Sequence, residues 1–355
     1  MDSGTKVNWL KVLQYTVLLS VILYVGKNLF IPLSFALLLS FVLYPVCKWL
    51  EKKGLPRWSA IFVCLLCWLV VISGLAWLLV RQVIALADDW PTIQAKFVNS
   101  WYNLSHYLEK NYGFDTTTQV SWLESMASDA ASTIFGMAKQ IVYTSAVSMV
   151  LVVLIPLYVA LILYNREQLA NALFAFFPVA EYQIIKAILH ETITTYYNFI
   201  KGMAMVYLVV AILNCVGLML LGIPHAIFFG VVASILTFIP YIGITIGALL
   251  PIVIAWISFD SVWYPLGVVI VFAIVQYLEA NLIFPWAVSY RLQVNMLFTL
   301  LAIVAGGILW AASGMILFVP FLAILKLIAD KHKELGAVSL LLGHKDDIRV
   351  RKKMD

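Results

Sequence analysis

Long apolar runs are the feature that most restricts how this chain can fold. Several stretches of about 20 residues carry almost no charge, as in LVVLIPLYVALILY at the end of 141–164. About 20 apolar residues are what an α-helix needs to cross the hydrocarbon core of a bilayer. The sequence therefore predicts an all-α polytopic membrane protein.

The composition supports this prediction and excludes other classes. Of the 355 residues, 63% are hydrophobic and only 12% are charged, and the mean hydropathy is +0.98. Soluble globular domains are about 45–50% apolar and about 25% charged. A soluble enzyme is therefore excluded, as is a disordered, collagen-like, coiled-coil or nucleic-acid-binding chain. The net charge of +5 is typical of basic cytoplasmic loops rather than of an anionic partner.

The charges between the apolar runs predict the topology. The short loop CKWLEKKGLPRW holds Lys48, Lys52, Lys53 and Arg57, and basic loops face the cytoplasm. Both termini are then cytoplasmic, in a multi-pass membrane protein. We expect about eight to ten membrane segments, with single spans near 10–26, 30–47, 59–80, 141–164, 203–222 and 264–284 and two broken hairpins at 226–258 and 297–328.

The hairpins are predicted from length and from interruptions. One helix over 297–328 would be about 48 Å long, whereas the hydrocarbon core is about 30 Å thick. We therefore expect a hairpin there and another at 226–258, each of which either crosses the membrane or re-enters it. Each hairpin follows a single span, and the two units enter from opposite sides. Such an inverted repeat with Gly/Pro breaks is typical of secondary transporters.

These features divide the chain into six predicted regions. Trp90-Pro91 and the Gly113-Phe114-Asp115 region are expected to divide the second region into two or three amphipathic helices, which form a lid, a substrate-gathering domain or a surface for subunit packing. The regions are an N-terminal membrane scaffold (1–81), an extracytoplasmic amphipathic helical region (82–140), a membrane span (141–164), a cytoplasmic helical linker (165–202), the inverted-repeat transport domain (203–328) and a basic cytoplasmic tail (329–355).

Polar residues inside the spans are the strongest candidates for chemistry. Glu279 lies in GVVIVFAIVQYLEANLIFPW, with Gln276 and Asn281 beside it. A charged carboxylate at the bilayer centre costs about 2.5–3.5 kcal/mol on insertion scales, so it is kept where it pairs, titrates or binds a cation. Gln276 and Glu279 share a helix face because they are three residues apart. We predict that Glu279 is the coupling site, with Gln276 and Asn281 as neutral ligands; an interfacial Glu279 with a structural partner is the alternative.

Breaks in the two hairpins are the second set of candidates. In TFIPYIG the proline frees a backbone carbonyl and the glycine permits a tight reversal, so that backbone dipoles face a solute. The structural alternatives are a proline kink without a ligand and close helix packing by small residues. The predicted substrate-site positions are Thr237, Pro240, Tyr241, Gly243, Pro285, Gly306, Gly307 and Gly314.

Signatures of enzymes and metal sites do not occur in the sequence. It contains no HExxH, GxSxG, Walker or dinucleotide-binding motif. The cysteines Cys47, Cys64, Cys67 and Cys215 all lie in apolar runs, and the CxxC has no second pair or nearby His. The sequence therefore predicts packing cysteines, no cofactor, no metal, no enzyme and no ATP-driven pump.

Four ordered motifs resemble those of the AI-2E (autoinducer-2 exporter) family. LGIPHAIFFGVVASIL with TFIPYIGITIGALLP resembles one hallmark, and QYLEANLIFPWAV resembles another. YPVCKWLEKKGLPRWSA resembles the first cytoplasmic loop of the family, and GGILWAASGMILFVPFLAILK its last hairpin. The chain departs from the family at Ile244, where a Pro is usual, and after Pro285, where it reads AVSYRLQVNMLF instead of Gly and a later Leu-His-Pro.

The resemblance implies a multi-span permease with an elevator-like motion, assembled as a homopentamer. Members of the family are linked to autoinducer-2 export and to sodium or lithium/proton antiport. We therefore expect a secondary transporter that exports a small polar solute such as autoinducer-2, coupled to protons or cations. A Na⁺(Li⁺)/H⁺ antiporter is the alternative, and a non-transporting membrane scaffold is the third reading. The expected partners are a solute or cation, membrane lipids and further copies of the chain.

Overall fold

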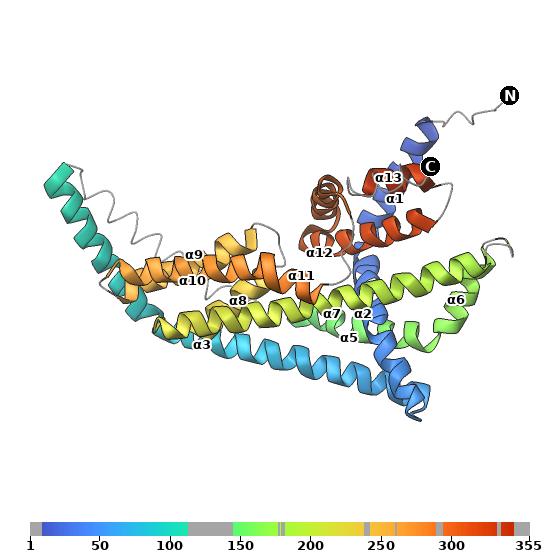
Figure 1. Ribbon diagram of the computed structural model, residues 1–355, viewed down its shortest axis with the longest axis horizontal. Coiled ribbons are helices and arrows are strands. Elements are labelled where there is room, and N and C mark those ends of the chain that lie inside the picture. Colours follow the sequence, from blue (N-terminus) through green and yellow to red (C-terminus); the bar gives the residue numbers. More distant parts are fainter. Residues whose placement is uncertain are drawn as a thin grey trace. The chain divides into compact units, whose positions relative to one another are not determined.

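The computed structural model describes residues 9–112, 145–176, 178, 182–237, 242–259, 261–288, 294–331 and 335–343. The described part is helical and contains no strand, which confirms the all-α prediction (Figure 1). Its helices are α1 (Trp9–Val25), α2 (Lys27–Lys52), α3 (Arg57–Tyr112), α5 (Ser145–Tyr164), α6 (Arg166–Ala175), α7 (Tyr182–Leu220), α8 (Ala226–Leu236), α9 (Ile242–Ser258), α10 (Trp263–Leu278), the π-helix η2 (Glu279–Ile283), α11 (Phe284–Ala287), α12 (Met296–Lys331) and α13 (Gly336–Leu342).

Several described helices are suited to a membrane. Five of them are long and apolar enough to cross it, at Lys27–Lys52, Arg57–Leu86, Tyr182–Leu220, Trp263–Ala287 and Met296–Asp330. Shorter apolar helices lie at Leu13–Val25, Val153–Tyr164, Ala226–Leu236 and Gly247–Ser258. A polytopic helical protein is thus confirmed, whereas the total of eight to ten segments stays a prediction.

Helix α3 differs from the prediction at its proline. We expected a break at Trp90-Pro91, but Pro91 lies inside α3, which continues from Arg57 to Tyr112. Proline has no N–H to bond the carbonyl of residue 87. Position 91 is exposed, so water can bond the freed carbonyl and the helix can continue. The remainder of the predicted extracytoplasmic region, 113–140, lies outside the described residues.

The chain folds into two compact units. Unit 1 comprises residues 1–67, 149–200 and 290–355, and unit 2 comprises 68–148 and 201–289. The hairpin segment 226–258 therefore belongs to unit 2, and the segment 297–328 belongs to unit 1. The division of the chain by function and the inverted relation between its two repeats stay predictions.

Two clusters of apolar side chains stabilise unit 1. The first joins α2, α3 and α5 through Ala36, Leu43, Cys47, Ile61, Cys64, Val159 and Leu163. The second joins α2, α7 and α12 through Leu38, Tyr196, Trp310 and Leu317. Cys47 and Cys64 are free and buried in the first cluster, where they serve as small packing residues.

Helix α12 reverses direction in its middle. Trp310 and Ala311 have non-helical dihedral angles, with φ +50° at Ala311. An unbroken helix would hold Gly306 and Gly314 about 12 Å apart, yet a methyl group added to either glycine would overlap the backbone carbonyl of the other. The two halves of α12 therefore pack side by side as a hairpin. The indole N–H of Trp310 donates to the carbonyl of Leu23 at 2.9 Å, which fixes the turn against α1.

Two ion pairs of unequal burial join the start of α6 to its neighbours. Arg166 Nη2 lies 2.5 Å from Glu51 Oε2, and these side chains are only 15% and 20% exposed. Burial acts to lower the pKa of Arg166, but the hydrogen bond and charge of Glu51 raise that pKa above its usual value. Arg57 pairs with Glu167, whose side chain is 68% exposed.

This difference in burial predicts unequal effects on stability. Arg166→Gln is expected to lower the free energy of unfolding by about 1.5–3 kcal/mol, because it leaves a mostly buried carboxylate without its partner. Arg57→Gln is expected to cost less than about 1 kcal/mol, since water solvates Glu167 when the pair is broken. Unfolding of the full chain in detergent measures both, and equal losses in the two variants would contradict the assignment.

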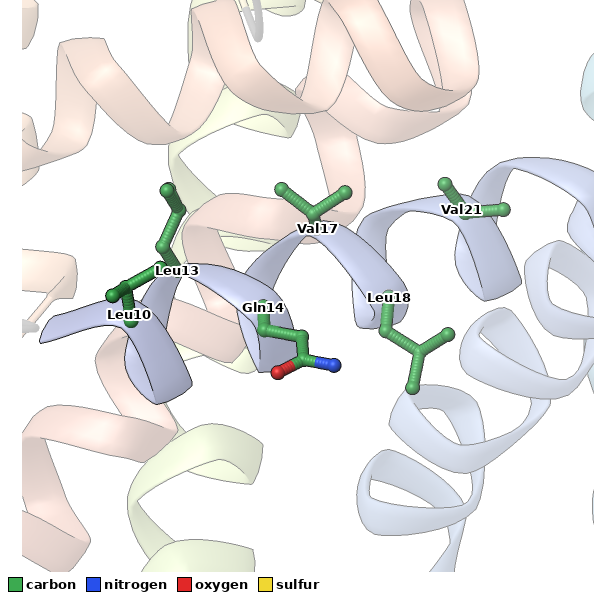
Figure 2. A pocket seen from close by; sticks show the side chains of 6 residues that line it. All are labelled: Leu10, Leu13, Gln14, Val17, Leu18 and Val21. Carbon is green, nitrogen blue, oxygen red and sulfur yellow. The ribbon is translucent and has the colours of Figure 1, made fainter. Parts of the chain in front are cut away.

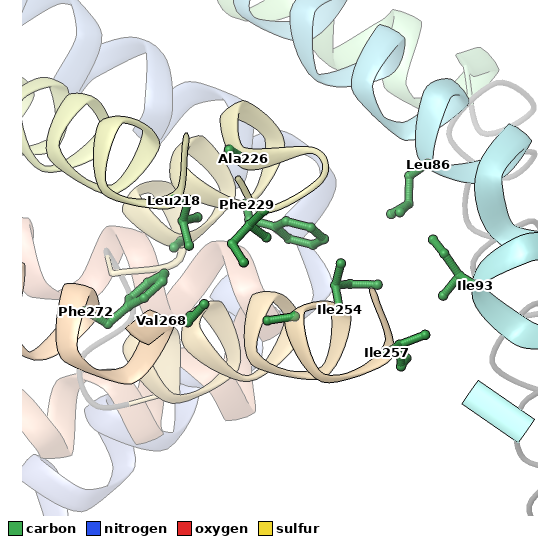
Figure 3. Close-up of a cluster of buried hydrophobic side chains, with 12 residues drawn as sticks. Leu86, Ile93, Leu218, Ala226, Phe229, Ile254, Ile257, Val268 and Phe272 are labelled. Carbon is green, nitrogen blue, oxygen red and sulfur yellow. The ribbon is translucent and has the colours of Figure 1, made fainter. Parts of the chain in front are cut away.

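Unit 2 packs the second half of α7 with α8, α9 and α10 around one apolar core (Figure 3). In Figure 3, Leu86 and Ile93 of α3 face Ile254 and Ile257 of α9. The core comprises Leu86, Ile93, Leu218, Ile223, Ala226, Phe229, Ala233, Ile254, Ala255, Ile257, Val268 and Phe272.

The turn from α7 to α8 follows from its sequence, LGIPH. Gly222 has φ +71°. Its N–H donates to the carbonyl of Met219 at 2.9 Å, and the N–H of Ile223 donates to the carbonyl of Leu218 at 3.0 Å. This Schellman arrangement commonly ends a helix at glycine. His225 then begins α8 as its N-cap residue, with φ +55°.

Small residues bring α7, α8 and α9 close together. A methyl group at Gly230 of α8 would lie 2.7 Å from the backbone nitrogen of Cys215 on α7. A methyl group at Gly247 of α9 would lie 2.9 Å from Cα of Ala233 on α8. These contacts set the end of α8 beside α7 and α9 and so position the residues described next.

Candidate functional site: a polar pocket in the membrane helices

Glu279 begins a π-helical turn inside a helix of membrane length. α10, η2 and α11 together form the candidate span Trp263–Ala287. The local sequence accounts for the irregular turn. Pro285 has no N–H for the carbonyl of Asn281, and the Asn281 side chain donates to the carbonyl of Tyr277 at 2.9 Å, a bond that competes with the backbone ladder. π-Helical turns are rare and frequently occur at functional sites.

Glu279 lines a small pocket inside unit 2. The cavity measures about 10 Å³, which is about the space that one water molecule needs. Its walls bring one acid and three neutral polar side chains together among apolar residues. The lining residues are Val210 and Asn214 of α7, Ala233 of α8, Thr237 just after α8, Phe272, Val275 and Gln276 of α10, and Glu279 of η2.

The candidate membrane span Trp263–Ala287 forms one side of the pocket. Glu279 follows Trp263 by sixteen residues, about 24 Å along a straight helix, and the hydrocarbon core is about 30 Å thick. Helix α8 has 11 residues and is about 16 Å long, so Thr237 at its end comes only part of the way through such a core. Glu279 thus lies inside a candidate membrane span, a type of segment in which polar groups are costly.

The polar groups of the pocket mainly offer oxygen atoms. Thr237 Oγ1 donates its proton to the carbonyl of Ala233 at 2.9 Å, so only its lone pairs remain for a ligand. Tyr207, one turn before Val210 on α7, lies within electrostatic range of Glu279. Ser234 Oγ donates to the carbonyl of Tyr207 at 2.6 Å. No basic side chain belongs to the residues that line the pocket.

The structure brings three of the predicted site residues together. Gln276, Glu279 and Thr237 line the same pocket. Asn281 does not, because it is exposed and its amide bonds the carbonyl of Tyr277. Residues two positions apart on a helix do not share a face, which separates Asn281 from Glu279.

The other predicted positions lie elsewhere in the chain. Pro240 and Tyr241 fall outside the residues that the structure describes. Gly243 lies in the first turn of α9, and Pro285 is exposed in α11. The glycines of the second hairpin belong to α12 of unit 1 and are Gly306, Gly307 and Gly314.

Asn214 is a lining residue for which the sequence carries only a weak signal. It is 3% exposed and faces the pocket from α7. Its only signal in the sequence is a single amide in the apolar run AILNCVGLML. That signal does not specify a neighbour, because Glu279 is distant in sequence and approaches only when α7 and α10 pack.

A second hollow, of about 490 Å³, follows α1 and has a different character (Figure 2). Leu13, Val17 and Val21 point to one side of the helix in Figure 2, and Gln14 is the only polar side chain of the lining. Such a surface suits lipid chains or protein packing rather than a polar solute. The lining residues, all exposed, are Leu10, Leu13, Gln14, Val17, Leu18 and Val21. Within the described ranges, no group of three or more His, Cys, Asp or Glu is placed to hold a metal ion.

The sequence model of the family described as "AI-2E family transporter" matches residues 13–333 of the chain. The chain belongs to the AI-2E transporter family. It is 26% identical over 320 residues to the Bacillus subtilis protein named "Putative transport protein YrrI", a match that covers 84% of this chain and 85% of the relative. YueF of the same organism is 26% identical over 84% of this chain and 83% of the relative. YhhT of Escherichia coli K12 is 22% identical over 90% of both.

This membership confirms the family that the sequence motifs predicted. It also identifies the protein as a transporter. The matched residues include the α2–α3 loop, the α8–α9 segment, Glu279 and the α12 hairpin. The Glu279 pocket therefore lies in the part of the chain that defines the family. Transporters of this class are generally not enzymes.

Proposed function

We propose that this AI-2E family member is a secondary transporter of the bacterial inner membrane that exports a small polar solute, such as autoinducer-2, coupled to protons or cations. The observation that carries the proposal is the Glu279 pocket, in which the acid of a membrane-length helix meets three neutral polar side chains. A charged carboxylate at this depth is costly. Binding of a proton or cation neutralises the carboxylate and removes that cost. The free energy of the site then depends on whether the ion is bound, which is what coupling requires.

The size of the pocket favours a Na⁺(Li⁺)/H⁺ antiporter as the second candidate. About 10 Å³ suits one species of the size of water. A solute of several heavy atoms does not fit there, so in the exporter it binds at another position and the pocket holds only the coupling ion. In the antiporter the pocket itself alternates between proton and metal cation.

We propose that the α8–α9 hairpin re-enters the membrane. Helix α8, about 16 Å long, is too short to cross a core of about 30 Å. Irregular backbone at that depth is tolerated where protein buries it or where it lines a wet cavity. Thr237, the last described residue before the break of this hairpin, then contributes its hydroxyl oxygen to the pocket that contains Glu279.

The family resemblance extends this proposal to the whole assembly. The transport domain (203–328) would move in an elevator-like manner against a scaffold formed by residues 1–164, in a homopentamer with both termini in the cytoplasm. Gly306, Gly307 and Gly314 would serve this motion by keeping the second hairpin thin and rigid. The basic loop of Lys48, Lys52, Lys53 and Arg57 supports the cytoplasmic orientation.

Proteoliposomes that contain a pH-sensitive dye test the function. Sodium, lithium and autoinducer-2 are added in turn, with protein-free liposomes as the control. A cation-driven pH change would identify the antiporter, whereas a proton flux or solute movement with autoinducer-2 alone would identify the exporter. If folded, inserted protein gave no flux with any of these, the non-transporting scaffold would be favoured.

A further inference from the structure

Asn214 differs from the other buried polar side chains of the described part. Four buried side-chain atoms there have no hydrogen-bond partner, namely Glu51 Oε1, Arg166 Nη1, His225 Nε2 and Asn214 Oδ1. Glu51 and Arg166 bond each other through their other atoms, and His225 Nε2 lies 3.1 Å from Asp89 Oδ2. For Asn214 the described residues provide no such polar contact.

An unpartnered amide oxygen in this position indicates a ligand. Buried polar atoms in native proteins nearly always have a partner, since leaving one without a partner costs free energy. The Asn214 side chain lines the pocket that contains Glu279, and that pocket suits one species of the size of water. A ligand held between the two side chains would satisfy both.

The oxygen atoms of the pocket suit a small positive species, while the amide nitrogens of Asn214 and Gln276 can only donate hydrogen bonds. An ionised Glu279 only accepts hydrogen bonds, the amide oxygen of Asn214 only accepts, and the hydroxyl proton of Thr237 is already given to Ala233. The lining has one acid and no base, which matches a single positive charge. A proton carried on Glu279 or on a bridging water satisfies these atoms, and so does a bare alkali-metal cation.

We infer that Asn214 is a ligand-binding residue of the coupling site, and that its amide oxygen and the Glu279 carboxylate hold one monovalent cation or proton between α7 and η2. The inference rests on the proposed function, because it assigns a further residue and the charge of the ligand to the same pocket. Asn214 then determines how tightly the site is occupied, while Glu279 supplies the charge.

The remaining titratable groups that face the pocket are few. Tyr207 on α7 is within electrostatic range of Glu279. Cys215, also on α7, points to α8, with its thiol 3.6 Å from the carbonyl of Ile227. The described residues of α8 and α9 carry no titratable side chain, and α10 adds Tyr264 and Tyr277. Glu279 is therefore the group whose protonation the ligand changes.

Thermal unfolding of the purified full chain in detergent tests the inference without transport. The midpoint temperature is followed against pH in a choline buffer, and against sodium or lithium at fixed pH. A ligand that binds only the folded state raises the midpoint with concentration, which yields an apparent affinity. Four proteins are compared: wild type, Asn214→Leu, Glu279→Gln and the matched control Cys215→Ala, which alters the neighbouring residue outside the pocket lining.

We expect the affinity of Asn214→Leu for the ligand to fall at least about tenfold, because a hydrogen bond or ligand to a charged species is lost. Cys215→Ala is expected to match wild type, and Glu279→Gln to lose the response. A response to pH that is lost in Glu279→Gln identifies the ligand as a proton, and a response to sodium or lithium that is lost in the same variant identifies a metal cation. The ligand-free midpoint of Asn214→Leu shows whether the variant is folded; if it is not, the smaller Asn214→Ala replaces it.

Two outcomes would overturn the inference. Wild-type affinity in Asn214→Leu, together with loss of the response in Glu279→Gln, would remove Asn214 from the site and leave the proposed function intact. A wild-type protein whose stability responds to neither pH nor alkali cations would show that the pocket binds no such ligand. Wild-type affinity in Glu279→Gln would instead contradict the proposed coupling site itself.

Discussion

Glu279→Gln is expected to reduce ion-coupled transport to the level of protein-free vesicles while the protein remains folded and inserted. Glutamine preserves the shape of the side chain but can neither exchange a proton nor supply the negative charge of the pocket. The variant also removes an acid from a candidate membrane span, and a charge at the bilayer centre costs about 2.5–3.5 kcal/mol, so its thermal stability without ligand should equal or exceed that of wild type. Initial rates in dye-loaded proteoliposomes measure the loss.

Two further variants test whether the loss of transport comes from the missing charge at position 279. Glu279→Asp keeps the charge on a shorter side chain and is expected to retain part of the activity. Asp88→Asn neutralises an exposed acid of α3 that does not line the pocket and should transport like wild type. Coupled transport by Glu279→Gln at the wild-type rate would remove Glu279 from the mechanism.

Gly314→Ala is expected to be the most damaging small substitution in α12. A methyl group there would overlap the backbone carbonyl of Gly306, and a backbone cannot rotate away as a side chain can. Overpacking of this kind costs about 1–3 kcal/mol and at times more. Gly306→Ala should have a similar effect, since its methyl group would overlap the carbonyl of Gly314. Thermal unfolding in detergent should show a clearly lowered midpoint for each.

Gly74→Ala provides the matched control for these variants. Gly74 also lies inside a candidate membrane span, but an added methyl group there would meet no atom within 4 Å. Because alanine favours helices over glycine by about 1 kcal/mol, this change should be neutral or stabilising. Equal midpoints for Gly314→Ala and Gly74→Ala would mean that the halves of α12 do not touch at the glycines.

Much of this architecture was predictable because the membrane leaves few options. The length of the apolar runs alone predicts helices that cross the bilayer. A single helix over 297–328 would be longer than the hydrocarbon core is thick, which predicts a reversal. The sequence located that reversal less well. The glycines at 306 and 314 suggested the position of the break. In the structure the chain reverses at Trp310 and Ala311, and the two glycines lie where the two halves of α12 pack against each other.

Only the local part of the candidate site was predictable. Gln276 and Glu279 share a face because three residues separate them, and the structure places both in one pocket. Asn281 was grouped with them by proximity in sequence, yet two residues along a helix lead to another face. Asn214 joins the pocket only through the packing of α7 against α10, which one chain without relatives does not specify.

The most direct test of the account is whether the carboxyl group of Glu279 changes state when the protein works. Infrared difference spectra of reconstituted protein, recorded before and after addition of the driving cation or solute, report the carbonyl stretching band of protonated carboxyl groups. We predict a band that appears or disappears in wild type and is absent in Glu279→Gln. The same change in both proteins, or a change missing from a wild type that transports, would contradict the central claim that Glu279 binds the coupling ion.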